Sequence, residues 1–301
     1  MKKNERYYYT DFISYLKKTF GEKYGKIGLT LHTPCPNDPP CIYCNQTSFL
    51  PHTSKKLFTV KEQIDDALPY LKKKYQTDKF IAYFQDNTST FGNIEYLFKS
   101  FSEAMNPENI KVLAISTRPD NVSIGILEML KKASNNKPVW LELGLQSIHD
   151  STLSDIKRGH TFQEFMNAYN LIRENTDFKI GIHMIIGLPN ETDSMIYSSM
   201  KKINEVKPDY LKFHHLQVLN NTELTNLYSS GSYNPLTLEK YLELFCNSLS
   251  YLKKDIVIQR LLSRAHSNEL IAPKWGISTE QFKNIFKEYM DHHGLYQGSK
   301  T

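Results

Sequence analysis

Two patterns of apolar residues alternate along most of this chain. Short, nearly continuous apolar runs are typical of buried strands, and longer segments with an apolar residue every three or four positions are typical of helices with one buried face. The expected strands cover 27–31, 79–84, 111–115, 139–145, 179–186 and 210–216. The expected helices cover 8–20, 60–75, 93–105, 123–133, 150–157, 162–174 and 191–205.

Repeated strand–helix units predict a parallel sheet, because consecutive parallel strands need a crossover between them. Six such units in a chain of 301 residues predict an α/β fold, a partial (β/α)6 TIM-type barrel. Beyond residue 220 we expect only a helix over 236–252, a short strand at 256–258 and a helix over 279–291. The predicted domains are therefore a barrel with an N-terminal helix, 1–220, and a small, mostly helical C-terminal subdomain, 221–301.

Polar residues gather where the expected strands end. In a parallel barrel these carboxyl ends share one edge, where the active sites of such folds lie. This clustering is the strongest internal evidence for an enzyme. The residues concerned are Gln85 and Asn87 after the second strand, Ser116 and Arg118 after the third, Glu142 and Gln146 on and after the fourth, and Gly187 after the fifth.

The composition is that of a globular protein, with 40% hydrophobic and 23% charged residues. The net charge is +5, and residues 1–26 hold seven basic and three acidic side chains, so most of the excess is N-terminal. No apolar segment of a signal peptide follows these lysines, and no run approaches the ~20 apolar residues of a membrane helix. We expect a cytoplasmic protein without a membrane partner, in which clustered cysteines bind metal rather than form disulfides.

Three of the four cysteines lie within ten residues, directly after the first expected strand: Cys35, Cys41 and Cys44. The prolines between and beside them stiffen the loop and suit it to hold ligands. Zinc needs a fourth ligand, which His32, His52 or Cys246 would have to supply. A [4Fe–4S] cluster held by three thiolates keeps one iron open. We interpret Cys246, inside an amphipathic helix, as a small buried apolar residue.

The chain resembles the radical S-adenosylmethionine (SAM) superfamily, and within it the YhcC/YtqA-like group, a relative of the radical SAM part of the Elongator catalytic subunit. The resemblance implies a [4Fe–4S] cluster on the three loop cysteines, with the open iron binding SAM and one electron cleaving it to a 5′-deoxyadenosyl radical. It rests on the segments 19–23, 35–37, 83–85, 116–120, 140–147, 158–160, 183–189, 212–214 and 270–275.

The loop itself departs from the family pattern. Five residues separate Cys35 from Cys41, whereas the superfamily's usual spacing has three and the YhcC/YtqA-like group has a longer insertion. The close pair Cys41 and Cys44 is kept, so a cluster is still expected.

The resemblance also implies roles for residues at the strand ends. Gln85 and Asn87 fall where the superfamily contacts the SAM amine. Arg118, beside Ser116, would pair with the SAM carboxylate, or instead with Asp120.

Among the remaining strand-end residues, Glu142 and Gly187 each have two possible roles. Glu142 would bind the ribose of SAM or pair with Arg158, because a carboxylate in so apolar a strand needs a partner. Gln146 and Arg158 are similar to positions near SAM. Gly187 would allow recognition of adenine by the main chain, or simply form a tight turn.

Lys212 and His214 point to one face of the sixth expected strand, because side chains alternate along a strand. Inside a barrel they would lie beside the substrate, and we name them as candidate catalytic residues. The alternative is a core histidine and a lysine at the rim.

For the substrate, the resemblance implies the wobble uridine of tRNA, whose carboxymethylaminomethyl group at C5 becomes an aminomethyl group. Aromatic residues interleaved with the N-terminal lysines are compatible with RNA binding. A small-molecule or protein substrate is the alternative, and a non-enzymatic zinc or Fe–S binding protein is the competing class. A radical SAM enzyme would also need an electron donor such as flavodoxin or ferredoxin.

Overall fold

The computed structural model of the protein describes residues 8–45, 59–85, 87–263, 265 and 268–301. In this part of the chain seven parallel strands form one sheet, in the order β1-β2-β3-β4-β5-β6-β8. A separate antiparallel pair joins β7 (Val218–Leu219) to β9 (Leu270–Ala272). The sheet strands are β1 (Gly25–Leu29), β2 (Phe80–Phe84), β3 (Ile110–Thr117), β4 (Val139–Gln146), β5 (Lys179–Ile186), β6 (Tyr210–His215) and β8 (Val257–Arg260).

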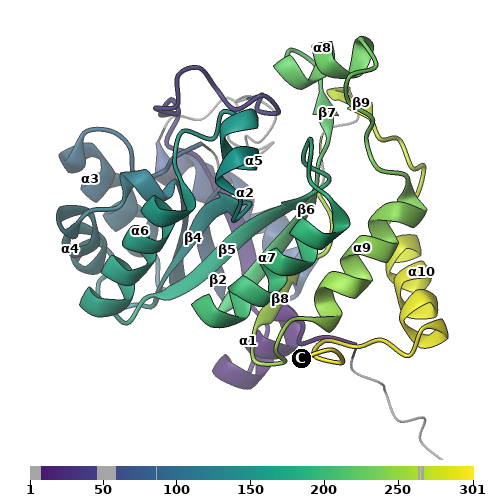
Figure 1. The fold of residues 1–301 in the computed structure, drawn as a ribbon. Coiled ribbons are helices and arrows are strands. Elements are labelled where there is room, and N and C mark those ends of the chain that lie inside the picture. The colour runs from purple at the N-terminus through teal and green to yellow at the C-terminus, as the bar shows by residue number, and fades with distance from the viewer. Residues whose placement is uncertain (1–7, 46–58, 86, 264, 266–267) are drawn as a thin grey trace, which may run out of the picture.

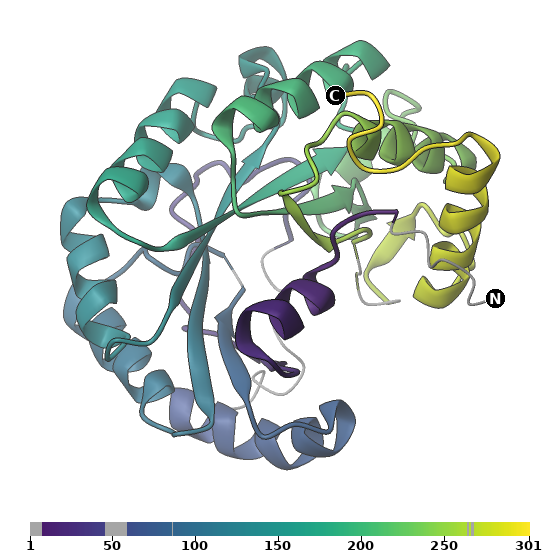
Figure 2. The same cartoon turned by 90° about the horizontal axis from the view of Figure 1, so that it is seen from below.

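The sheet curls into a half-barrel with helices along its convex side (Figures 1 and 2). An apolar layer fills the space between this face and the helices, as where the rings of Phe84 and Phe101 meet edge to face with centroids 4.9 Å apart. The helices are α1 (Phe12–Phe20), α2 (Val60–Tyr75), α3 (Ile94–Met105), α4 (Ile124–Ala133), α5 (Asp150–Asp155), α6 (Phe162–Asn175), α7 (Asp193–Val206), α8 (Glu223–Ser229), α9 (Leu238–Ser250) and α10 (Thr279–His292).

Helix α1 lies on the concave side of the sheet, at the end where the strands begin (Figure 2). The Phe12 ring packs edge-on against Trp140 and Tyr210, with centroids 5.7 and 5.9 Å away. These buried rings form a floor beneath the barrel interior.

The predicted fold class is confirmed, while several element boundaries and the number of strands in the sheet differ from expectation. The helix expected over 8–20 begins at Phe12, because the Asp11 carboxylate accepts the N–H groups of Ile13 and Ser14 and caps the helix there. The first strand ends at Leu29 rather than at residue 31. The sheet has seven strands instead of six.

The additional strand is β8, which we expected in a separate C-terminal subdomain. It pairs in parallel with β6, Tyr210 opposite Val257 and Leu211 opposite Ile258. The alternating pattern gave no sign of this pairing, because no single strand–helix unit connects the two strands. The domain boundary at residue 220 stays a prediction. Among the described residues, no helix is long and apolar enough to cross a membrane.

Close packing inside the barrel yields a test at Gly181 on β5. A Cβ there would overlap the ring of Tyr210 and press on Cγ of Glu142. We expect Gly181→Ala to lower the free energy of unfolding by about 1–3 kcal/mol through overpacking. Gly125→Ala in α4 is the matched control: its Cβ meets nothing within 4 Å, and alanine favours helix. Denaturant unfolding of both variants measures the difference, and equal stabilities would contradict close packing around Gly181.

Candidate active site

A cavity of about 560 Å³ lies in the barrel, reaching from the loop after β1 into the interior. It brings together polar residues from all seven strands of the sheet and from the loops that follow them. Gly187 is the one predicted site residue that does not line it. The predicted residues that do are Cys35, Cys41, Cys44, Gln85, Asn87, Ser116, Arg118, Glu142, Gln146, Arg158, Lys212 and His214.

The cysteine loop is held to the barrel by Ile42, one of the two residues between Cys41 and Cys44. Ile42 is buried, and its N–H donates to the carbonyl of Ile156 while its own carbonyl accepts from the N–H of Leu224. The N–H of Cys44 donates to the carbonyl of Cys41 at 2.9 Å, which closes a tight turn. This turn presents two thiols to the cavity, and Cys35 adds a third.

The surroundings of the thiols suit a metal cluster. Asn37 Nδ2 donates to Cys41 Sγ at 3.4 Å and Arg158 Nη1 approaches the same sulfur at 3.8 Å. Burial above all, and then the neighbouring Cys41 and Cys35, raise the pKa of the Cys44 thiol to about 12, because thiolates repel one another. A bound iron–sulfur cluster would supply the positive charge that stabilises all three thiolates.

The thiols are not arranged around a single ion. In the described part of the chain, no three side chains of His, Cys, Asp and Glu are placed to hold one metal ion. A cubane cluster binds its thiolates at separate irons, so its ligands stand further apart. Cys246 is fully buried in α9, away from this cavity. His52, considered as a fourth zinc ligand, lies outside the described residues.

Arg118 and Arg158 frame the cavity next to the thiols. Arg118 makes a bidentate pair with Asp120 at 2.9 Å, the alternative we weighed for it, and donates to the carbonyl of Arg158 at 2.8 Å. Arg158 Nη2 donates to the carbonyl of Gly144 at 2.6 Å. The ion pair weighed between Glu142 and Arg158 is absent, because the Arg158 guanidinium turns toward Cys41.

The other predicted SAM contacts have local roles as well. Asn87 donates to the carbonyl of Thr33 at 3.0 Å and so ties the loop after β2 to the cysteine loop. Gln146 lines the cavity with a left-handed backbone, φ 75°. Gly187 also has positive φ, and a Cβ there would meet Leu236, which supports its reading as a tight turn. Contact of these residues with SAM stays a prediction.

The barrel interior is organised around one buried carboxylate, that of Glu142. Its Oε2 accepts from Tyr83 at 2.6 Å, from His183 at 2.8 Å and from Lys212 at 2.5 Å. Ser116 adds a further hydrogen bond at 3.1 Å, and Gln259 donates to the other oxygen at 2.9 Å. These partners, Lys212 above all, hold the pKa of Glu142 well below its usual range, against the opposing effect of burial.

Lys212 and His214, the two candidate catalytic residues, both face this cavity. Burial lowers the pKa of Lys212 to about 7, although Glu142 opposes the shift. Ser263 Oγ donates to the carbonyl of His215, so it accepts from Nδ1 of His214, which lies 3.2 Å away. Nε2 of His214 is therefore a lone-pair acceptor, and it is buried without a partner among the described residues.

The sequence prediction missed five residues of this interior: Lys26, Tyr83, His183, Gln259 and Arg260. Each sits on a strand, and alternation along strands already predicted that one face of each strand points inward. Lys26 could not have been found in this way, because the first expected strand began at residue 27, whereas β1 begins at Gly25. Gln259 and Arg260 could not, because β8 was not expected in the sheet.

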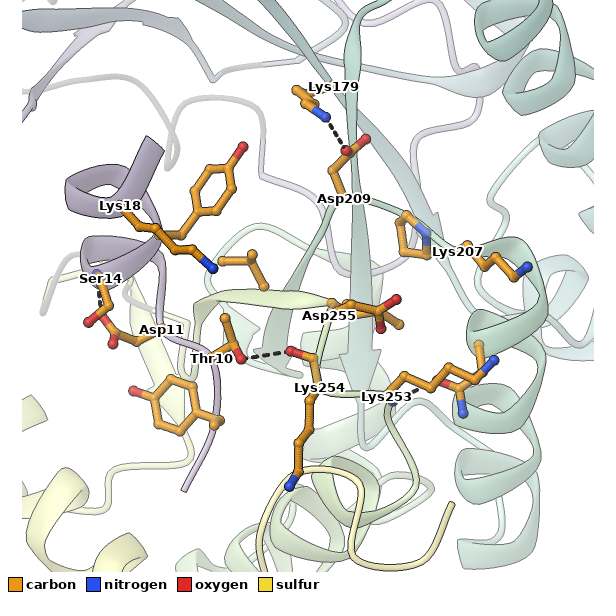
Figure 3. A pocket seen from close by; sticks show the side chains of 16 residues that line it. Thr10, Asp11, Ser14, Lys18, Lys179, Lys207, Asp209, Lys253, Lys254 and Asp255 are labelled. Carbon is orange, nitrogen blue, oxygen red and sulfur yellow. Dashed lines mark hydrogen bonds and ion pairs between the residues drawn. The ribbon is translucent and has the colours of Figure 1, made fainter. Parts of the chain in front are cut away.

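A second cavity, of about 630 Å³, lies at the opposite end of the barrel, where β5, β6 and β8 begin (Figure 3). Lys179 pairs there with Asp209 at 2.9 Å, and Thr10 donates to the carbonyl of Lys254. Although this cavity is the larger, it contains no thiol and lies at the amino ends of the strands. The chemistry of parallel barrels is found at the other end.

A parallel half-barrel with three thiols beyond its first strand defines an enzyme that cleaves SAM. Residues 30–203 match the radical SAM superfamily, and residues 208–291 match the radical SAM C-terminal domain. The first match spans more than half of the chain, which therefore belongs to the radical SAM superfamily, as its motifs predicted. The family implies SAM and a [4Fe–4S] cluster, and the three loop thiols are the residues that would hold the cluster.

Relatives extend over nearly the whole chain. It is 28% identical to Protein YhcC of Escherichia coli (strain K12) over 94% of this chain and 92% of that protein. It is 25% identical to a tRNA uridine(34) acetyltransferase of Methanocaldococcus jannaschii over 61% of this chain and 33% of that protein. The solved structure of archaeal Methanocaldococcus infernus Elp3 with an N-terminal deletion has the same fold, with a TM-score of 0.72 and 21% identity over 91% of this chain and 64% of that one.

The cysteine assignment can be tested on the purified protein. After anaerobic reconstitution we expect Cys41→Ala to lose the bound iron and the brown charge-transfer absorption, because only two thiolates remain. Cys246→Ala should keep both, since that residue packs in the core of α9. Iron content and the absorption spectrum are the measurements, and equal loss of iron in both variants would contradict the assignment.

The lowered pKa of Lys212 predicts a pH dependence of stability. Between pH about 7 and the ordinary value of 10.5, the unfolded chain holds a proton on this lysine that the folded protein has released. The free energy of unfolding contributed by Lys212 therefore rises with pH, by at most ~1.4 kcal/mol per pH unit. Lys212→Met should lose this rise and exposed Lys73→Met should keep it. Urea unfolding between pH about 7 and 8.5 measures both, and parallel curves for wild type and Lys212→Met would contradict the shift.

Proposed function

We propose that this radical SAM enzyme remodels the C5 side chain of the wobble uridine in tRNA, converting a carboxymethylaminomethyl group to an aminomethyl group. The observation that carries the proposal is a single cavity shared by the thiol loop and by a polar barrel interior. A volume of about 560 Å³ lies within the ordinary range of ligand pockets, ~300–1,000 Å³. A base turned out of the anticodon loop would enter from the edge where the strands end.

The names of relatives support the choice of tRNA. Two archaeal relatives are named tRNA uridine(34) acetyltransferase, and the one from Methanocaldococcus infernus matches 89% of this chain at 23% identity. Elongator complex protein 3 of Mus musculus is 28% identical over 52% of this chain. For this chain we propose the same position of the same base, with a different change to its side chain.

The proposed division of labour follows the geometry of the cavity. When bound, the cluster and SAM supply a 5′-deoxyadenosyl radical that removes a hydrogen atom from the substrate. Cys35, Cys41 and Cys44 hold the cluster, and Arg158 donates toward Cys41 beside it. Lys212 lies deeper in the barrel, where its pKa of about 7 allows it to give or take a proton near neutral pH.

We propose that the rest of the tRNA contacts the protein around the mouth of the cavity, at the edge where the strands end. The lysines of α1 lie at the opposite end of the barrel, and residues 1–7 lie outside the described part, so neither carries the proposal (Figure 2). Flavodoxin or ferredoxin as electron donor and a cytoplasmic location stay predictions.

The wobble nucleoside of cellular tRNA tests the proposed function. A strain that lacks the gene should accumulate carboxymethylaminomethyluridine and lose the aminomethyl product. Wild-type protein should restore the product and Cys41→Ala should not, because cluster binding is required. Nucleoside analysis of purified tRNA by mass spectrometry is the measurement. An unchanged wobble-uridine profile in the deletion strain would sink the proposal.

A further inference from the structure

The barrel interior holds more positive than negative charge. Lys26, Lys212 and Arg260 all line the cavity, and Glu142 is the carboxylate that lines it with them. Lys212 is paired with Glu142 at 2.5 Å. Lys26 lies over two aromatic rings, 4.7 Å from the centroid of Phe12 and 4.8 Å from that of Tyr83. In the part of the chain that the structure describes, Lys26 and Arg260 have no hydrogen bond or ion pair with a carboxylate.

Glu142 cannot neutralise these two further cations. Its Oε2 already accepts four hydrogen bonds and its Oε1 accepts the amide of Gln259. Cations removed from bulk water and left without a counter-charge are unfavourable, so the interior favours the entry of an anion. Burial, together with the charge of Arg260, lowers the pKa of Lys26 to about 8, against the opposing effect of Glu142.

In the described part of the chain, two buried acceptors, one on β6 and one on β8, have no donor. They are Nε2 of His214 and Oε1 of Gln259. Nδ1 of His214 donates to Ser263 and the amide nitrogen of Gln259 donates to Glu142, so the free atom of each side chain can only accept. A ligand that satisfies both atoms carries an N–H or O–H donor close to its anionic group.

These groups are distinct from the thiol end of the cavity. The sulfurs of the loop contact Asn37, Thr88 and Arg158. Lys26 is instead the second residue of β1, below the loop, and interacts with Glu142 and Arg260. The amino and carboxylate groups of SAM belong at the open iron, so the cations deeper in the barrel are left for a different carboxylate.

We propose that Lys26 and Arg260 bind a carboxylate of the substrate, and that Gln259 and His214 accept hydrogen bonds from an amine next to that carboxylate. This inference rests on the proposed function for the identity of the ligand. The carboxymethylaminomethyl side chain carries an amine and a carboxylate one carbon apart, whereas its aminomethyl product has lost the carboxylate. The site would therefore distinguish substrate from product.

Binding of two anticodon stem–loops to the reconstituted holoenzyme with saturating SAM tests the site. One carries carboxymethylaminomethyluridine and the other aminomethyluridine at the wobble position. We expect wild type to bind the first about tenfold more tightly, the effect of a charge-assisted hydrogen bond to the carboxylate. Lys26→Met should bind both alike, and Lys26→Arg should recover part of the preference. Lys111→Met, on β3 but not at the cavity, is the matched control and should discriminate like wild type.

A small probe separates this inference from the proposed function. N-methylglycine has the amine and the carboxylate of the side chain without the tRNA, and methylamine lacks the carboxylate. If neither stem–loop binds but N-methylglycine binds wild type and not Lys26→Met, the proposed function is wrong and the carboxylate site stands. Equal affinity of wild type for the two stem–loops overturns the site. Displacement of SAM by N-methylglycine also overturns it, because the cations would then hold the carboxylate of SAM.

Discussion

The ion pair between Glu142 and Lys212 is the interaction on which the interior of this barrel depends. A carboxylate that is 1% exposed can stay ionised only with strong partners, and its partners come from five other strands of the sheet. Tyr83, Ser116, His183, Lys212 and Gln259 lie on β2, β3, β5, β6 and β8 respectively. The carboxylate thus requires the curvature of the sheet, because only a curled sheet brings so many strands to one point.

This requirement divides the cavity into two chemically different ends. At the carboxyl edge lie three thiols and two arginines, where we predict the site for an iron–sulfur cluster and SAM. Below it, an interior with excess positive charge and unfilled acceptors is suited to a polar group of the substrate. The aromatic floor around Phe12, Trp140 and Tyr210 closes the lower end. Under the proposed function, a substrate group that enters from the edge would meet the radical source first and its binding groups beyond it.

Much of the fold could be predicted because the apolar pattern directly reports burial. The strands from β2 to β6 and the helices between them follow from it, and so does the gathering of polar residues at one edge. The boundary at α1 was missed because a cap, Asp11, outweighed the apolar pattern. Strand β8 was expected at 256–258 but not as part of the sheet, because its partner β6 is distant in sequence and no repeated unit joins them. Lys26 and Arg260 were missed for related reasons. Lys26 lies just before the first expected strand, and Arg260 lies on a strand that was not assigned to the sheet.

The sequence by itself predicted the class of enzyme, because its motifs resemble one family along most of the chain. It also predicted the three loop cysteines as cluster ligands, because cysteines in a short loop are close in space whatever the rest of the chain does. It also placed Arg118 and Glu142 at the site, since strand ends meet in any parallel barrel. Only the tertiary structure decided the partners of these charges. Glu142 pairs with Lys212 rather than Arg158, which turns instead to Cys41. Pairing between side chains from different strands depends on register and curvature, and neither is encoded in local spacing.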